Sequence, residues 1–86
     1  MSRQLIQPIH VLFNFLQQKE QVFIWLYDNP NVKFQGYVKG FDEFLNVVLD
    51  ECVEINVKSD TRNELGQLLL KGECITLIQP VLDVMQ

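Results

Sequence analysis

The apolar residues of this chain change their spacing near Gln21, and that change restricts the fold more than any other feature. Before it, apolar positions recur at the intervals of a helix face while polar ones such as His10 form the opposite stripe, which predicts an amphipathic helix over about residues 7–18. The apolar positions of this helix are Ile9, Leu12, Phe13 and Leu16. After Gln21 the residues are β-branched, aromatic or alternating, so the sequence predicts one helix followed by a β-sheet.

Five segments after the helix are predicted to be antiparallel strands. They are residues 22–27, 32–39, 45–55, 67–70 and 74–79. The polar stretch 56–64 has no periodicity and predicts a surface loop, while Gly36 and Gly40 predict bends at which two strands approach closely. Alternation predicts core faces made of Val32, Phe34 and Val38 in the second strand and of Leu45, Val47, Leu49 and Val53 in the third.

Size, charge and cysteine content narrow the possible functions. A chain of 86 residues forms one small domain with little room for a deep active-site cleft. The net charge of −4 argues against holding a nucleic-acid backbone on a broad basic surface. No segment has the length of a membrane span and no signal-peptide pattern is visible, so we expect an intracellular protein. Cys52 and Cys74 have no metal-ligand spacing and are predicted to be buried thiols, and no metal or cofactor is expected.

Two polar turns between apolar strands carry groups that suit an unpaired nucleobase. The first, within residues 40–50, supplies the ring of Phe44 and the amide of Asn46, and the second, residues 70–73, supplies the cation of Lys71. An aromatic ring can stack on a base, an amide offers a donor and an acceptor to the base edge, and a cation can cover the other face or a phosphate. We therefore predict that single-stranded RNA binds here.

Two further residues are expected to shape these turns. A carboxylate facing RNA would repel phosphate, so Asp42 is predicted to hold the first turn and the Asn46 side chain by hydrogen bonds from behind the binding surface. Gly72 is predicted to let the backbone come close. The other aromatic residues considered are assigned to packing in the core or in a subunit interface, namely Trp25, Tyr27, Tyr37 and Phe41.

The two turns together resemble the two-part motif of the Sm and Sm-like RNA-binding proteins. The first part corresponds to about residues 21–55 and the second to about residues 65–79. The residues that carry the resemblance are Gly40, Asp42, Phe44, Asn46, Lys71 and Gly72. The resemblance implies the Sm fold, in which an N-terminal helix precedes a strongly bent five-stranded antiparallel sheet that forms a small open barrel. It also implies a single domain over residues 1–86, with a short tail at 80–86.

A function follows from the resemblance as an expectation. The segments 68–70 and 75–78 are strongly β-prone, and natural proteins seldom leave such sheet edges open. In the Sm family these edges pair until a heteroheptameric ring closes. The ring binds a uridine-rich single-stranded site of spliceosomal small nuclear RNA and forms the core of snRNPs for pre-mRNA splicing, in the nucleus after a cytoplasmic assembly phase. For this chain the implied neighbours are other Sm proteins, the F and G subunits.

Three alternatives stay open from the sequence. An Sm-like ring would act on U6 RNA or in mRNA decay with the same chemistry, and a pure scaffold subunit would make little direct RNA contact. An enzyme could use Cys52 or Cys74 with His10, or the carboxylates of Asp42 and Glu43. The enzyme is disfavoured, because His10 lies on the polar helix face and no basic group is near either cysteine in sequence.

One departure from the family pattern concerns the second turn. The residues after Gly72 are Glu73 and Cys74, where the family commonly has Asp or Asn followed by Asn. A longer acid at position 73 is expected either to weaken the approach of phosphate or to pair with Lys71 and orient it. Both effects would change affinity more than fold.

Overall fold

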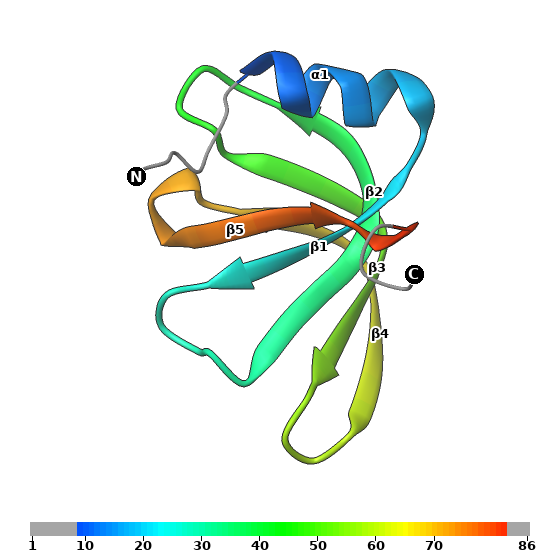
Figure 1. Ribbon diagram of the computed structural model, residues 1–86, viewed down its shortest axis with the longest axis vertical. Helices are drawn as coiled ribbons and strands as arrows, with labels where there is room; N and C mark the ends of the chain where they lie inside the picture. The colour runs from blue at the N-terminus through cyan, green and yellow to red at the C-terminus, as the bar shows by residue number, and fades with distance from the viewer. Residues whose placement is uncertain (1–8, 83–86) are drawn as a thin grey trace.

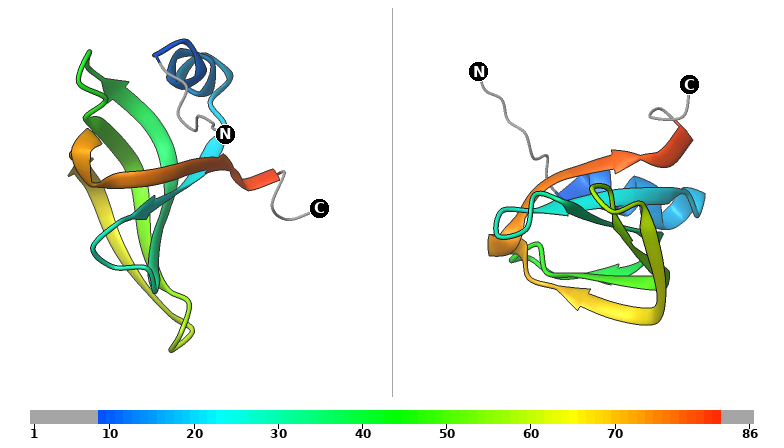
Figure 2. Two further views of the ribbon diagram at one scale, coloured as in Figure 1. Left: turned by 60° about the vertical axis from the view of Figure 1, so that its left-hand side comes forward. Right: turned by 90° about the horizontal axis from the view of Figure 1, so that it is seen from below.

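Five strands form one antiparallel sheet in the order β4-β3-β2-β1-β5, and a single helix precedes them (Figure 1). The computed structural model describes residues 9–82. Its elements are α1 (Ile9–Gln18), β1 (Gln21–Leu26), β2 (Val32–Phe41), β3 (Val47–Asn56), β4 (Thr61–Leu70), the 3₁₀ turn η1 (Gly72–Cys74) and β5 (Ile75–Pro80). The sheet curls strongly into an open barrel (Figure 2). The predicted fold class, one helix followed by a bent five-stranded antiparallel sheet, is confirmed.

The main core lies inside the curl of the sheet. Alternate residues of the strands point into it, as the pleat of a strand requires, and Leu12 of α1 closes it from the helix side. Its buried strand residues are Val22, Ile24, Val32, Phe34, Val38, Val47, Leu49, Cys52, Leu70 and Ile75. The core face predicted for residues 32–38 of β2 is therefore confirmed.

The helix uses a narrower apolar face than the sequence predicts. Leu12 is buried, and Phe15 and Leu16 pack against the core beside it, but Ile9 is 41% exposed and Phe13 is 48% exposed. Phe13 follows Leu12 directly and so lies about 100° around the helix from it, away from the sheet. Of the predicted apolar face, Leu12 and Leu16 therefore meet the core, whereas Ile9 and Phe13 do not. Predicted helix residues 7 and 8 lie outside the described residues.

The predicted loop over residues 56–64 is mostly strand. The β3–β4 turn occupies only residues 57–60, and β4 begins at Thr61. The side chain of Asn56 tightens this turn, because its Oδ1 accepts the N–H groups of Lys58 and Ser59 at 3.0 Å each. The first residues of β4 are exposed, so no apolar alternation marks them as strand in the sequence. The loop prediction is therefore wrong beyond residue 60.

The third predicted strand also needs two corrections. It begins at Val47, because Leu45 has a positive φ of 65° and lies in the turn before the strand with Asn46. Later, Glu51 adopts φ 51° at a shift in the pairing of β3 with β4. This bulge inverts the alternation, so Cys52 enters the main core in place of Val53.

The glycines of β2 differ in what they permit. A Cβ on Gly36 would lie 2.8 Å from the carbonyl oxygen of Asp50 on β3, so only glycine allows β2 and β3 to approach this closely at the bend. A Cβ on Gly40 would meet nothing within 4 Å. The predicted close approach is confirmed at Gly36 and wrong at Gly40.

Candidate nucleic-acid interface

The β2–β3 turn is organised by the carboxylate of Asp42. Its Oδ1 accepts the N–H groups of Phe44 at 2.9 Å and Asn46 at 3.1 Å. The backbone closes the same turn, since the N–H of Leu45 donates to the Asp42 carbonyl oxygen at 3.0 Å. With its backbone held in this way, Phe44 projects from the turn with 72% of its side chain exposed.

The amide of Asn46 is fixed in one orientation by two hydrogen bonds. Its Nδ2 donates to Asp42 Oδ2 at 2.9 Å, and its Oδ1 accepts the N–H of Gly72 at 2.9 Å. A carboxylate can only accept and a backbone N–H can only donate, so a flipped amide would lose both bonds. One N–H and one oxygen lone pair of Asn46 remain free. The hydrogen bonds predicted from Asp42 to the turn and to this side chain are confirmed.

Gly72 brings the second turn against the first. A Cβ at this position would lie 2.8 Å from the carbonyl carbon of Leu45, a backbone atom that cannot move aside. Only glycine fits there, and the short contact places the Gly72 N–H within reach of Asn46. The predicted close approach of the backbone at Gly72 is therefore confirmed as geometry.

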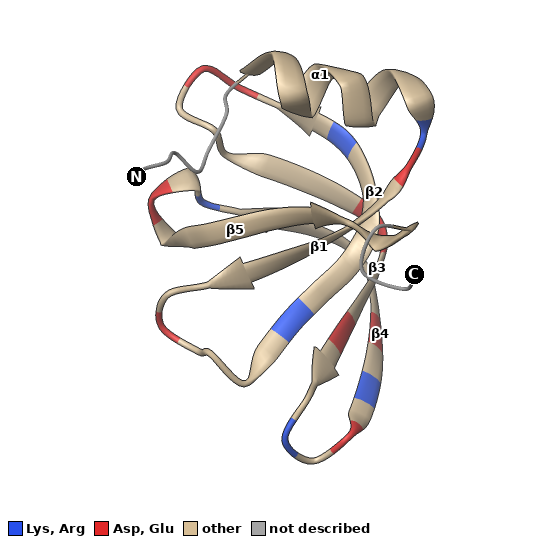
Figure 3. Cartoon of the chain, in the orientation of Figure 1, with Lys and Arg blue, Asp and Glu red and all other residues tan. Residues whose placement is uncertain are grey.

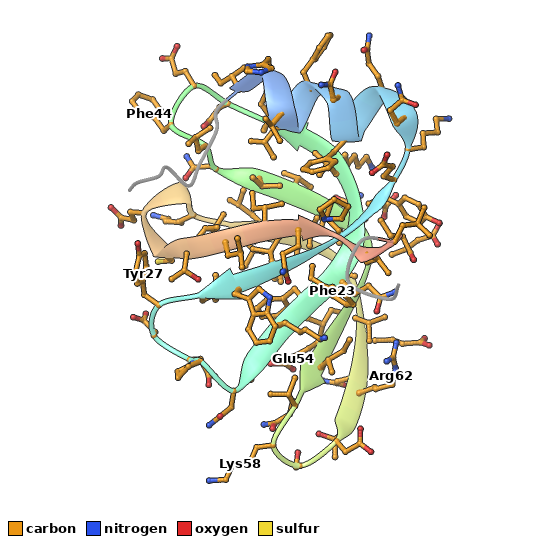
Figure 4. All side chains as sticks on the ribbon, in the orientation of Figure 1. Phe23, Tyr27, Phe44, Glu54, Lys58 and Arg62 are labelled. Carbon is orange, nitrogen blue, oxygen red and sulfur yellow. The ribbon has the colours of Figure 1, made fainter. Side chains whose placement is uncertain are left out.

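The two turns form one open hollow at the edge of the barrel. Its volume is about 510 Å³. It is lined by Phe44, Asn46, Lys71, Gly72 and Glu73. All four residues predicted to bind RNA thus meet at one place, with the Asp42 carboxylate bonded to Asn46 beside them. Figure 4 shows Phe44 pointing outward from this edge. Glu73, the acid expected from the sequence to influence the second turn, belongs to the same hollow.

The electrostatics of the site are local. The pKa of Asp42 is lowered from its ordinary value, first by the hydrogen bond from the Asn46 side chain and further by backbone N–H groups, although partial desolvation opposes the shift. The carboxylate is therefore ionised at neutral pH. Basic side chains lie scattered among acidic ones over the described strands (Figure 3). Lys71 is the cation that lines the hollow.

The two cysteines predicted to be buried thiols differ: Cys74 is only half-buried, so the prediction is wrong there, and Cys52 is unsuited to act as a nucleophile. Cys52 is buried, and loss of solvent together with nearby Glu54 raises its pKa to about 11. Its thiol is therefore protonated at neutral pH, whereas the nucleophile in thiol chemistry is the thiolate. His10 is exposed on α1, as predicted, and Glu43 is exposed as well.

Residues 9–82 contain neither a cluster of metal-ligating side chains nor a helix that could span a membrane. No group of three or more His, Cys, Asp or Glu side chains in this part of the chain is placed to hold a metal ion. No helix within it has the length and apolar character needed to cross a bilayer.

The aromatic residues assigned to packing divide into two groups. Trp25 is half-buried, and its indole N–H donates to Gln79 Oε1 at 2.9 Å. Phe41 packs against the main core and Tyr37 is half-buried. Tyr27 differs, since 65% of its side chain is exposed, so of the two predicted settings the core is excluded for Tyr27 and the subunit interface stays a prediction.

Comparison with known proteins identifies the family. Residues 14–80 match the LSM domain. The chain belongs to the LSM family. This LSM chain is 46% identical over 78 residues to the probable small nuclear ribonucleoprotein E of Caenorhabditis elegans, covering 91% of this chain and 87% of the relative. It is 48% identical over 77 residues to small nuclear ribonucleoprotein E of Schizosaccharomyces pombe, covering 90% of each. The predicted family is confirmed.

A more distant relative and two solved structures complete the comparison. The LSM complex subunit LSM5 of Saccharomyces cerevisiae is 33% identical over 87 residues, covering 93% of this LSM chain and 89% of the relative. A heptameric archaeal Sm protein shares the fold at a TM-score of 0.72 and 24% identity, covering 84% of this chain and 97% of that one. The Pyrococcus abyssi Sm protein in complex with a uridine heptamer has a TM-score of 0.72 and 25% identity, covering 87% and 99%.

Proposed function

We propose that this chain is a subunit of a heteroheptameric Sm ring that binds a uridine-rich single-stranded site of spliceosomal small nuclear RNA and forms the core of snRNPs for pre-mRNA splicing. The observation that carries the proposal is the hollow at the barrel edge, where an exposed ring, an oriented amide and a cation converge. Support comes from the relatives named small nuclear ribonucleoprotein E and from the Sm protein solved with a uridine heptamer.

Each residue of the hollow has a separate role in this proposal. Phe44 stacks on one face of a uracil, a contact worth about 1–3 kcal/mol in single-strand binders. The free N–H and free lone pair of Asn46 match the O4 and N3–H of the uracil edge. Lys71 covers the opposite face or a phosphate, and Gly72 with Asp42 holds Asn46 in place. Lys71 is the cation that lines this hollow, which fits a subunit that holds one base and not a long stretch of phosphate backbone.

Ring formation uses the two edge strands of the sheet. β4 and β5 lie at opposite edges, and exposed apolar side chains along them include Leu69 at 58% and Leu77 at 41%. Contacts between two different edges must close into a ring or grow into a fibre. We propose the F and G subunits as the neighbours in the ring, the nucleus as the site of action, and a cytoplasmic phase for assembly.

The test is photo-crosslinking of a uridine tract to the reconstituted ring. Phe44→Ala and Lys71→Ala remove exposed side chains, so both variants are expected to assemble normally. Loss of stacking corresponds to roughly a fivefold or greater loss of affinity for Phe44→Ala, and crosslinking to this chain should fall accordingly. Helix variant Phe13→Ala serves as the control, because its ring is also partly exposed but belongs to α1.

Unchanged crosslinking in both variants would favour the alternative of a scaffold subunit with little RNA contact. A second alternative, an Sm-like ring that acts on U6 RNA or in mRNA decay, has support from the yeast LSM complex relative at 33% identity. The sequence identity of this chain to that yeast relative is lower than its 46% and 48% identity to the two relatives named small nuclear ribonucleoprotein E. Native mass spectrometry of the purified complex separates the two, because the co-purified subunits name the ring.

A further inference from the structure

Three turns of the chain lie along one edge of the barrel. They are the β1–β2 turn at residues 27–31, the β2–β3 turn at residues 42–46 and the β4–β5 turn at residues 71–74, and the views of Figures 1 and 2 agree on this placement. Two hydrogen bonds donated by backbone N–H groups join the β4–β5 turn to the other two turns. The N–H of Gly72 donates to Asn46 Oδ1, and the N–H of Tyr27 donates to the Cys74 carbonyl oxygen, each at 2.9 Å. The β1–β2 turn is therefore a direct continuation of the proposed RNA site.

The two most exposed aromatic side chains among residues 9–82 both lie on this edge. Phe44 is 72% exposed and Tyr27 is 65% exposed. Figure 4 shows both pointing outward from the same side of the barrel, one on either side of the β4–β5 turn. Aromatic side chains spaced along one surface are how single-strand binders carry successive bases.

The surroundings of Tyr27 suit a base and not a phosphate. Beside it is an open hollow of about 320 Å³. Its other lining residues are Trp25, Leu26, Pro30, Thr76 and Leu77. No cation lines this hollow, and the residue that follows Tyr27 is the acid Asp28. A nearby cation is Lys33, whose Nζ lies 5.4 Å from the centroid of the Trp25 ring and which does not line the hollow. An apolar floor with an exposed phenol ring favours stacking.

We propose that Tyr27 is a second stacking position for the same RNA strand, and that it holds a base beyond the nucleotide at Phe44. This inference rests on the proposed function, because it extends the path of the RNA from the Phe44 hollow across the β4–β5 turn. The contact is apolar and adds no ionic interaction. It therefore lengthens the RNA segment that this subunit holds without adding to the salt dependence of binding.

The experiment measures affinity of the reconstituted ring for uridine heptamers and for the same RNA extended by two uridines at either the 5′ or the 3′ end. The unchanged ring should bind one extended RNA about fivefold or more tightly than the heptamer. Tyr27→Ala should remove that gain while it leaves heptamer affinity unchanged, and Tyr27→Phe should retain the gain because the ring remains. Phe13→Ala is the matched control of an exposed aromatic residue on α1.

Salt dependence provides an independent readout. Removal of one phosphate contact lowers the slope of log affinity against log salt by about 0.7 for single strands, which is the expectation for Lys71→Ala if that side chain meets a phosphate. Tyr27→Ala should leave the slope unchanged. A lowered slope in Tyr27→Ala would overturn the assignment of this position to stacking.

Other outcomes separate this inference from the proposed function. The stacking role of Tyr27 is wrong if the extended RNA binds no more tightly than the heptamer, or if Tyr27→Ala keeps the gain in affinity. It is also wrong if Tyr27→Ala prevents ring assembly, and that result would place Tyr27 in a subunit interface. If Phe44→Ala and Lys71→Ala also leave heptamer affinity unchanged, the proposed function itself fails.

Discussion

At the residue scale, the carboxylate of Asp42 accepts three N–H groups and thereby sets what Asn46 can recognise. Two of these come from the backbone of Phe44 and Asn46 and the third from the Asn46 amide. The free donor and acceptor of Asn46 are then presented in a fixed order. Uracil offers O4 and N3–H to such an amide, whereas cytosine offers N4–H and N3 in the opposite order, so a locked amide distinguishes the two bases.

Replacement of the carboxylate should therefore relax base discrimination. In Asp42→Asn, one oxygen of the side chain becomes an NH2 group. The remaining oxygen can still accept the two backbone N–H groups of the turn, but an NH2 group in place of Oδ2 cannot accept the Asn46 Nδ2–H, so the bond that orients the Asn46 amide is lost. We expect the variant ring to bind a uridine heptamer more weakly and to lose part of its preference over a cytidine heptamer, measured as the ratio of the two Kd values. Glu43→Gln, the same change of charge at the exposed neighbouring residue, should keep the ratio. An unchanged ratio in Asp42→Asn would show that the amide lock does not select the base.

At the element scale, apolar patterns predict the structure where they exist and fail where they do not. The alternation of residues 32–38 specifies β2, because one face of that strand is buried. The first residues of β4 are exposed on an edge strand. Because neither face of this part of the strand is buried, the sequence shows no alternation of apolar and polar residues there. The bulge at Glu51 also leaves no pattern in the sequence. A single residue with φ 51° changes which side chains point inward, and the amino-acid composition of the strand does not reveal it.

The candidate site was more predictable than these elements. An aromatic ring, an amide and a cation each indicate which contact with a base they can make. The hydrogen bonds that Asp42 accepts within its own turn are local in sequence. The contact between Asn46 and Gly72 joins positions 26 residues apart and depends on how β3 and β4 bring the second turn back. The sequence left Tyr27 between the core and a subunit interface for a similar reason, because a run of apolar residues does not show where burial by neighbouring elements ends.

The bend between β2 and β3 offers a test at the same scale. In Gly36→Ala the new methyl group would lie 2.8 Å from the Asp50 carbonyl oxygen, so the strands must separate at a cost of about 1–3 kcal/mol. Hydrogen exchange of this subunit in the assembled ring, read by mass spectrometry, should show faster exchange in β2 and β3. Gly40→Ala is the matched control, because its methyl group meets nothing within 4 Å. Equal exchange in the two variants would contradict the close approach at Gly36.

At the scale of the whole molecule, the sheet order leaves one chain with two open edges. β4 and β5 are separated by β3, β2 and β1, and the barrel stays open because these two strands do not pair with each other. Exposed leucines accompany both edges, with Leu65 and Leu69 on β4 and Leu77 on β5. Edges of this kind promote pairing with other chains, and a closed ring removes both at once.

A charge on the β4 edge should therefore block assembly. Leu69 is 58% exposed in the single chain, and burial of a leucine contributes about 1.5–3 kcal/mol. We expect Leu69→Lys to reduce incorporation into the ring about tenfold or more, measured by native mass spectrometry with a fixed amount of partner subunits. Val57→Lys, at an exposed apolar residue in the β3–β4 turn, should assemble normally. Full incorporation of Leu69→Lys would rule out this edge as an interface.

The bond between Gly72 and Asn46 has a consequence for when the protein becomes competent. Because the acceptor and the donor stand 26 positions apart, a nascent polypeptide that ends before Gly72 can form only the local bonds of the first turn, and the Asn46 amide is then held from one side. The chain must be synthesised through Gly72 before both bonds that fix the Asn46 amide can form. Fragments that end before Gly72 should consequently bind a uridine tract more weakly than chains that include it.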